Sequence, residues 1–261
     1  MPFTETDVGC RSFKALVLLW QGYPDQALAC GGAALAAARE LGHAFTESHA
    51  LYLNCWLHQV RGEPGIVRER ASAMISVTTE HNYPAWLAPA KVLHGWALAA
   101  TDSRESGIAQ MHEGIAEHAA LGVQQHRASL LGLLAGTYGR ARRSEEALTR
   151  LAEALAMVAR SGEHWFEAEL RRLRADVLFA GSPGQASNAE GSLHSALAVA
   201  REQGAKWSEL RAAMCMARLW RDQGKRHEAH ELLAPLYGWF TEGFDTLDLK
   251  RAKALLGELA Q

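Results

Sequence analysis

Apolar side chains recur along the chain with the three- and four-residue spacing of α-helices. Within 145–160, one stripe is formed by Ala147, Leu148, Leu151, Leu155 and Val158. Charged side chains occupy the opposite side of the same segment. No useful length of chain alternates with period two, and Ala, Leu, Glu and Arg far outnumber β-branched residues. The pattern therefore predicts an all-α protein.

Turn residues divide the chain into units of similar length. Gly and Asn tolerate the left-handed conformation that ends a helix, and they recur at intervals of 40, 40, 40 and 42 residues. The marks are Leu41-Gly42, His81-Asn82, Leu121-Gly122, Ser161-Gly162 and Gln203-Gly204. A second mark near the middle of each unit is Gly22, Gly62, Asp102, Arg142, Ser182 or Gly224. Each unit is thus predicted to be a hairpin of two helices.

Equivalent positions of the six units share side-chain size, which indicates how the hairpins pack. We call each set of equivalent positions a column. The first column has small side chains in all six units: Ala15, Cys55, Gly95, Ala135, Ala175 and Ala217. The second has small or compact side chains: Ala27, Val67, Gly107, Ala147, Ala189 and Ala229. A third column is large, which suggests a core: Leu35, Ile75, Ile115, Leu155, Leu197 and Tyr237. A single hairpin cannot bury its apolar face, whereas stacked hairpins share one core. An α-solenoid follows from this pattern.

We expect a single domain over 1–261, with about thirteen helices in six antiparallel pairs that form a right-handed superhelix. The predicted units are about 1–42, 43–82, 83–122, 123–162, 163–204 and 205–244. A capping helix, 245–261, would begin at Thr246 or Asp248 and cover the last pair with Leu255, Leu256 and Leu259. The insertion at 181–188 is expected to be mobile.

Composition narrows the function classes. The 261 residues are 48% hydrophobic and 21% charged, which excludes a disordered chain. A net charge of -2 provides no broad attraction for nucleic acid or a membrane surface. The longest charge-free apolar stretch, 26–38, is too short to cross a bilayer, and the first residues do not form a signal peptide. Four well-separated cysteines are interpreted as buried thiols in a reducing compartment, so we expect a cytoplasmic protein.

The candidate chemical motifs favour no enzyme. His227 and His230 are three residues apart and do not match the four-residue spacing of a helical zinc site. Each cysteine lies in an apolar helical context without a polarising neighbour. The basic runs 139–143 and 171–174 are interpreted as solvated helix ends and faces. We therefore predict no catalytic residue, no metal site and no cofactor.

The segments 22–28, 143–148 and 224–229 resemble the turn and second helix of the tetratricopeptide repeat (TPR). Each combines a polar turn with a following Ala. The usual repeat has about 34 residues, so helices about three residues longer would account for the longer unit. The resemblance implies a helical array that binds other molecules.

A closer resemblance lies in 22–28, 164–170, 210–213, 217–225 and 237–246. These segments are similar to the C-terminal repeat region of bacterial class III adenylate/guanylate cyclase–ATPase–TPR fusion proteins. Neither a GxxxxGK[ST] phosphate loop nor a metal-binding aspartate pair of a cyclase is found in the sequence. The resemblance implies a noncatalytic regulatory or scaffolding array.

Side chains on the first helices of the units suggest where a partner would bind. The expected groove follows the first helices on the concave surface, with an aromatic half and a charged half: Tyr52, Trp56, Trp96, Arg140, Arg172, Asp176, Arg211 and Arg218. It would bind a protein or peptide with acidic groups beside an apolar segment. Two alternatives stay open. Trp56 and Trp96 would pack against the next hairpin, or the array would sense a small molecule in an apolar pocket near them. A homo-oligomer is also compatible with the sequence.

Overall fold

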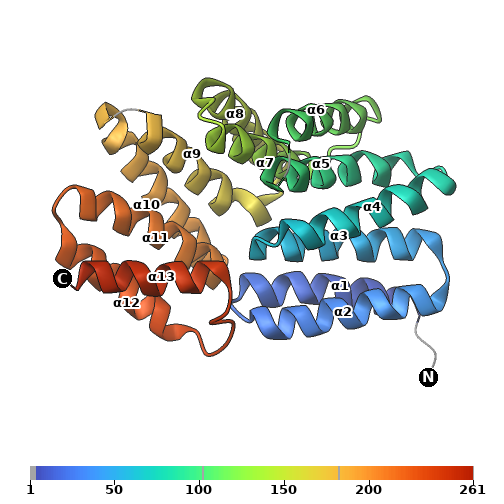
Figure 1. Ribbon diagram of the computed structural model, residues 1–261, viewed down its shortest axis with the longest axis horizontal. Helices are drawn as coiled ribbons and strands as arrows, with labels where there is room; N and C mark the ends of the chain where they lie inside the picture. Colours follow the sequence, from blue (N-terminus) through green and yellow to red (C-terminus); the bar gives the residue numbers. More distant parts are fainter. Residues whose placement is uncertain (1–3, 102, 182, 261) are drawn as a thin grey trace. The chain divides into compact units, whose positions relative to one another are not determined.

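The computed structural model describes residues 4–101, 103–181 and 183–260. Over these ranges the chain forms thirteen α-helices and two short 3₁₀ segments, without a strand (Figure 1). The predicted all-α class and number of helices are confirmed. Among the described helices, none combines the length and apolar character needed to cross a bilayer.

The chain divides into two compact units, and the first comprises Met1–Leu19 and Pro24–Leu130. Its helices are α1 (Glu5–Trp20, whose last residue belongs to the second unit), α2 (Pro24–Leu41), α3 (Ala44–Arg61), α4 (Pro64–Glu80), α5 (Pro84–Thr101) and α6 (Arg104–Ala120). From α2 to α6 each helix packs against the next, and α3 contacts α2, α4 and α5. A first helix of this unit is thus covered by its own partner and by both neighbouring hairpins.

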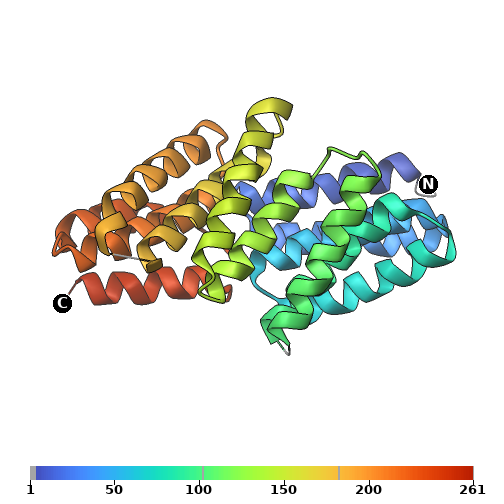
Figure 2. The same cartoon turned by 90° about the horizontal axis from the view of Figure 1, so that it is seen from above.

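The second unit comprises Trp20–Tyr23 and Leu131–Gln261. Its helices are α7 (Arg127–Arg140, whose first residues belong to the first unit), α8 (Ser144–Ser161), α9 (Glu167–Gly181), α10 (Ala186–Glu202), α11 (Lys206–Asp222), α12 (Arg226–Trp239) and α13 (Leu247–Leu259), with the 3₁₀ segments η1 (His164–Phe166) and η2 (Pro183–Gln185). In both views α13 lies beside α11 and α12, which it contacts (Figure 1; Figure 2).

The predicted turns separate the helices as expected. A positive φ occurs at Gly22, Gly42, Gly62, Asn82, Gly122, Arg142, Gly162, Gly204 and Gly224. At Gly62, φ is 77° and the amide donates to the carbonyl of Gln59, which ends α3. Asp102 and Ser182 lie outside the described residues. The helix pairs follow the predicted unit limits, whereas the single domain, the right-handed superhelix and the mobile insertion stay predictions.

Both small-residue columns are confirmed, since all twelve positions are buried. Glycines of these columns allow a close approach of α5 and α6. A Cβ atom added at Gly95 would lie 2.6 Å from the carbonyl oxygen of Gly107 and 2.9 Å from Cγ of Met111. Side chains at these two glycines would therefore force the helices apart.

The predicted core column is only partly correct. Leu35 and Leu197 are buried, but Ile75, Ile115, Leu155 and Tyr237 are half-buried. The column that is buried in all six units lies four residues earlier: Gly31, Ala71, Met111, Leu151, Leu193 and Leu233. A four-residue step turns a helical side chain by about 40°. The two columns therefore share one face, and the earlier one points more directly at the neighbouring helices.

The last helix covers the final pair, as expected. Thr246 is the N-cap residue of α13, and Asp248 lies in its first turn. Leu249, Leu255 and Leu259 are buried, while Leu256 is half-buried. The apolar side of α13 therefore faces the array.

The cysteines are all free thiols, but only two are buried. Cys55 and Cys215 fit the prediction, whereas Cys10 is exposed and Cys30 is half-buried. Cys10 lies on α1, and the thiol of Cys30 on α2 donates to the carbonyl of Arg11 on α1 at 3.3 Å. The prediction of buried thiols is wrong at both positions.

Candidate functional site

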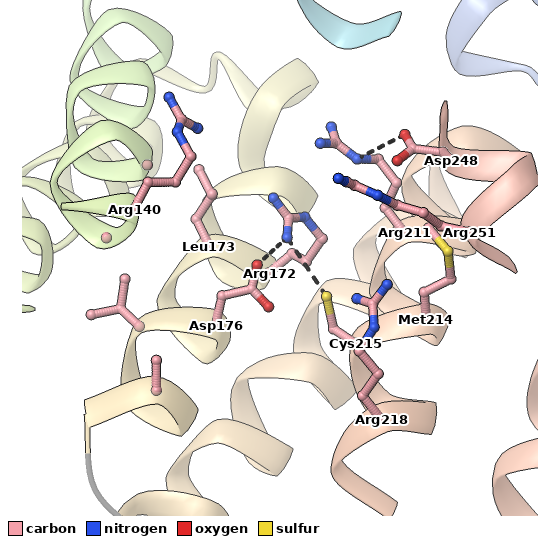
Figure 3. A pocket seen from close by; sticks show the side chains of 14 residues that line it. Arg140, Arg172, Leu173, Asp176, Arg211, Met214, Cys215, Arg218, Asp248 and Arg251 are labelled. Atoms are coloured by element: carbon pink, nitrogen blue, oxygen red, sulfur yellow. Dashed lines mark hydrogen bonds and ion pairs between the residues drawn. The ribbon is translucent and has the colours of Figure 1, made fainter. Parts of the chain in front are cut away.

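The candidate site is a cavity of about 350 Å³ within the second unit (Figure 3). Five arginines line it and define the arginine cavity: Arg140, Arg172, Arg211, Arg218 and Arg251. Four helices supply these side chains, namely α7, α9, α11 and α13. On α9 and α11 the lining positions recur at three- and four-residue steps, so each helix turns one face toward the cavity.

A buried ion pair forms the floor of the arginine cavity. Nε of Arg172 lies 2.8 Å from Oε2 of Glu169, and its Nη2 lies 2.6 Å from Oε1. Both side chains are buried. The remaining nitrogen, Nη1, contacts the carboxylate of Asp176 and lies 3.6 Å from the sulfur of Cys215. All three nitrogens of Arg172 are thus engaged within the protein.

Arg211 extends this network to the last helix. Its Nη1 lies 3.1 Å from Oε1 of Glu169, and its Nε lies 3.3 Å from Oδ2 of Asp248. The network therefore connects α9, α11 and α13 through alternating charges. Such a chain of ion pairs holds the guanidinium groups in fixed positions.

The charges of the network shift the pKa values of its members. Burial alone would raise the pKa of Glu169, but the positive charges of Arg172 and Arg211 outweigh it and hold this pKa at about 2. For Arg172, the effect of burial is outweighed by Glu169 and Asp176, which raise its pKa. Burial, with a contribution from Asp176, raises the pKa of the Cys215 thiol to about 12. Cys215 is therefore a neutral thiol, as its apolar sequence context predicts.

Neither Arg218 on α11 nor Arg251 on α13 forms an ion pair with an acidic side chain among the described residues. Arg140 donates to the hydroxyl of Thr137 at 3.1 Å. The three carboxylates of the network, those of Glu169, Asp176 and Asp248, all pair with Arg172 and Arg211, so the guanidiniums of Arg218 and Arg251 keep two unpaired positive charges among the described residues. The cavity is therefore suited to an anionic group.

The structure brings together the charged half of the expected groove. Its members all line the arginine cavity: Arg140, Arg172, Asp176, Arg211 and Arg218. Two of them, Arg172 and Arg211, form ion pairs within the protein and line the cavity as part of its fixed wall. Arg218 is the predicted residue whose guanidinium is available to a ligand.

The aromatic half of the expected groove is not open. Tyr52 and Trp56 are each 1% exposed and Trp96 is 6% exposed, so the prediction that they project from the surface is wrong. The reason is the packing of α3 and α5, which are enclosed by neighbouring helices. The rings of Tyr52 and Trp56 pack against one another with centroids 6.3 Å apart. These side chains belong to the core of the first unit.

A different set of aromatic rings lies on the surface of the first unit. Phe13 on α1 is 53% exposed and Phe45 on α3 is 47% exposed. The ring of His49 lies between Phe13 and Trp86, with centroids at 5.2 Å and 5.6 Å. These side chains form a partly exposed aromatic run across α1, α3 and α5, at positions that the column pattern does not distinguish.

Sequence reasoning misses the part of the cavity that comes from α13. The pattern places Asp248 and Arg251 on a helix whose expected role is to cover the last pair, yet both line the cavity. The sequence feature that could have indicated their role is their three-residue spacing, which places two charged side chains on one face of a helix whose other contacts are apolar. Glu169, beneath the cavity, is also missed, although its spacing to Arg172 is typical of a helical ion pair.

No metal site is found in the described part of the chain, where no three His, Cys, Asp or Glu side chains converge. The side chain of His227 is 80% exposed, and its Nε2 lies 3.4 Å from Oε1 of Glu231. The expected exposed character of this helix start is thus confirmed.

Comparisons with known proteins identify the fold. No protein-family model matches the chain. No curated protein sequence matches it significantly either. Among solved structures, RapI in its apo form is 12% identical, with a TM-score of 0.59 over 98% of this chain and 86% of that one. A single-residue variant of the nearly identical TPR-like repeats from a kinesin-light-chain candidate of Podosopora anserina is 18% identical. Its TM-score is 0.52 over 72% of this chain and 92% of that one. The chain therefore has a TPR-like helical-repeat fold.

Proposed function

We propose that this protein is a noncatalytic interaction module that binds an acidic segment of a protein or peptide partner in the arginine cavity. The observation that carries the proposal is the surplus of positive charge at Arg218 and Arg251, beside a network that already satisfies Arg172 and Arg211. An unpaired guanidinium gains a charge-assisted hydrogen bond when it meets a carboxylate or phosphate.

The cavity also offers apolar contacts. Leu173, Val177 and Met214 line it next to the arginines. A ligand that places an apolar side chain beside its acidic group would use both kinds of contact. This composition supports the expectation, made from the sequence, of a segment that is acidic and apolar together.

The cellular role is proposed from the sequence resemblance. The similarity of 164–170, 210–213 and 237–246 to cyclase–ATPase–TPR fusion proteins supports a regulatory part of a bacterial cyclase-like signalling protein, or a free-standing relative, in the cytoplasm. The TPR-like fold supports a scaffold that holds a partner, and is compatible with a homo-oligomer.

A small-molecule sensor is the second candidate. A cavity of about 350 Å³ falls within the range of small-molecule sites. Both indoles that the sequence analysis placed beside an apolar pocket are buried in the core of the first unit, and that pocket stays a prediction. A sensor that uses the arginine cavity would take an anionic effector.

The proposal is tested by reversing the two unpaired charges. The wild-type protein, the double variant Arg218→Glu with Arg251→Glu, and the control Arg160→Glu would be immobilised and exposed to a lysate of the source cell. Arg160 is an exposed arginine of α8 outside the cavity. We expect a partner to be retained by the wild type and the control, and lost from the double variant. A partner retained equally by all three would contradict the proposed site.

The two candidates are separated by the nature of what is retained. A protein partner cross-linked to α11 or α13 supports the interaction module. A small anion that raises the melting temperature, and does so in the control but not in the double variant, supports the sensor. Circular dichroism checks that both variants keep their helical content.

A further inference from the structure

We propose that the arginine cavity binds the phosphoryl group of a phosphate monoester, with Arg218 and Arg251 as its direct contacts. The inference rests on the proposed function, because it names the acidic group that the same cavity receives. It is carried by the charge surplus, the donor chemistry and the size of the cavity.

The charge surplus matches a dianion. Glu169, Asp176 and Asp248 pair with Arg172 and Arg211, so the guanidiniums of Arg218 and Arg251 are two unpaired positive charges, among the described residues, within one cavity of about 350 Å³. A phosphate monoester carries a charge of about −1.5 to −2 near neutral pH. A single phosphoryl group would compensate both unpaired guanidiniums, whereas a peptide would have to place two carboxylates in the same small space.

The donors are of the kind that phosphate prefers. Among the described residues that line the cavity, every basic side chain is an arginine. The planar guanidinium donates two parallel hydrogen bonds to phosphate oxygens, which the ammonium group of lysine does not. Arg218 and Arg251 reach the cavity from different helices, and Figure 3 shows the guanidinium of Arg251 next to Arg211 and that of Arg218 beside Cys215. They are placed to hold a phosphoryl group from two sides.

The internal network prepares the site before a ligand arrives. Glu169 and Asp248 hold Arg211, and Glu169 and Asp176 hold Arg172, so neither guanidinium has to be ordered on binding. Asp176 has an exposed carboxylate, 46% accessible at its side chain, which repels an anion on the Arg172 side. Asp248, which also lines the cavity, pairs with Arg211 in the same way, so the guanidiniums of Arg218 and Arg251 are the ones left for a phosphoryl group.

The cavity has room for a small group next to the phosphate. Leu173, Val177 and Met214 supply an apolar wall. The ligand class is thus a phosphate monoester that carries a short apolar or aromatic body. Such a monoester could come from a phosphorylated peptide or from a small phosphorylated metabolite, which share this chemistry.

Calorimetric titration of the full chain tests the proposal with matched probes. The probes are phenyl phosphate, a dianion, and methyl phenyl phosphate, a monoanion of similar size. We expect phenyl phosphate to bind at least about tenfold more tightly than the diester, because only the dianion compensates both guanidiniums. Arg218→Gln and Arg251→Gln should each weaken binding of phenyl phosphate by about tenfold or more, and Arg160→Gln should leave it unchanged.

Two peptides distinguish the source of the phosphate. One carries phosphoserine between leucines, and the other carries glutamate in its place. Tighter binding of the phosphoserine peptide than of phenyl phosphate supports a phosphorylated protein, and similar affinities support a small phosphorylated molecule. Both results support a phosphoryl site.

Three results would overturn the phosphoryl site: equal binding of the glutamate and phosphoserine peptides, equal binding of monoester and diester, or phosphate binding that Arg218→Gln does not change. A failure to bind any phosphate probe would overturn it as well. The acidic-partner proposal would survive all of these, since it fails only when charge reversal at Arg218 and Arg251 leaves partner capture unchanged. The two failures are therefore distinguishable.

Discussion

Arg172 and Glu169 form a two-point ion pair one helical turn apart on α9, with nitrogen to oxygen distances of 2.8 Å and 2.6 Å. Both side chains are buried, and Arg211 reaches the same carboxylate from α11 at 3.1 Å. One carboxylate thus orients two guanidiniums that form the back of the arginine cavity. The stability of the second unit and the shape of its site depend on the same contact.

Glu169→Gln should destabilise the protein strongly. The substitution leaves two guanidiniums facing an uncharged amide in a buried position, and breaking a buried pair in this way costs about 3–5 kcal/mol. Chemical denaturation would measure the free energy of unfolding. The control is Glu202→Gln on α10, an exposed position. Equal stability of the two variants would contradict the role of Glu169.

The same carboxylate should make stability dependent on pH. The pKa of Glu169 is lowered from 4.5 to about 2 in the folded protein. Its contribution is therefore complete above pH 4.5 and is lost as the pH falls toward 2, because protonation removes the charge that the arginines need. The free energy of unfolding of Glu169→Gln should vary less over this pH range than that of the wild type. Parallel pH profiles of the two proteins would argue against this assignment.

Ala175→Leu should overpack the contact between α9 and its neighbours. Ala175 is buried in the small-residue column of the first helices, and inserting a larger side chain at such a position costs about 1–3 kcal/mol. The control is Ala152→Leu on α8, where the alanine is exposed. Thermal unfolding of both variants is the measurement, and an unchanged melting temperature for Ala175→Leu would show that the column tolerates bulk.

Replacing Trp56 and Trp96 by alanine should unfold the first unit or weaken it severely. Both indoles are buried, and removal of a buried tryptophan typically costs about 3–5 kcal/mol. The matched control is Phe13→Ala, since this ring is largely exposed and its loss should change stability by about 0.5 kcal/mol or less. Circular dichroism melting curves compare the variants. A double variant as stable as the wild type would contradict the core role of both indoles and favour a role in recognition.

Loss of α13 should cause self-association. Truncation after Gly243 removes Leu249, Leu255 and Leu259 and exposes the surfaces of α11 and α12 that they cover. A milder variant, Leu255→Asp, should weaken the same contact, whereas Lys253→Asp on the exposed side of α13 should not. Light scattering after size-exclusion chromatography reports the molar mass. A truncated chain that stays monomeric and equally stable would contradict the covering role.

The helix pairs could be predicted because their signals are local. Turn residues such as Gly62 and Gly162 adopt the left-handed conformation that ends a helix, and each belongs to one unit. Small residues such as Gly95 and Gly107 report a close approach that few other side chains allow. These properties depend on the backbone of neighbouring residues and are visible in a single sequence.

The faces of the helices could not be predicted from the same signals. Trp56 follows a small packing residue, and its burial depends on how far α4 and α5 extend across α3. Likewise, the pattern predicts Arg218 as a site residue but not Arg251, whose place in the same cavity results from the docking of α13. Long-range packing decides which side of an amphipathic helix meets solvent, and the helical period leaves that choice open.

Because Asp248 and Arg251 lie on α13, the arginine cavity is complete only when α13 directly follows the hairpin of α11 and α12. The number of repeats at this end of the array therefore affects which ligand the cavity can bind. A repeat protein can gain or lose hairpins by duplication or deletion, and most internal units tolerate such changes because each contacts only its neighbours. Here, a hairpin inserted ahead of α13 would carry these two side chains away from Arg211 and Arg218 and dismantle the cavity. Related arrays that keep the cavity should therefore vary in their number of repeats on the N-terminal side of α7 and keep the order from α9 to α13 unchanged.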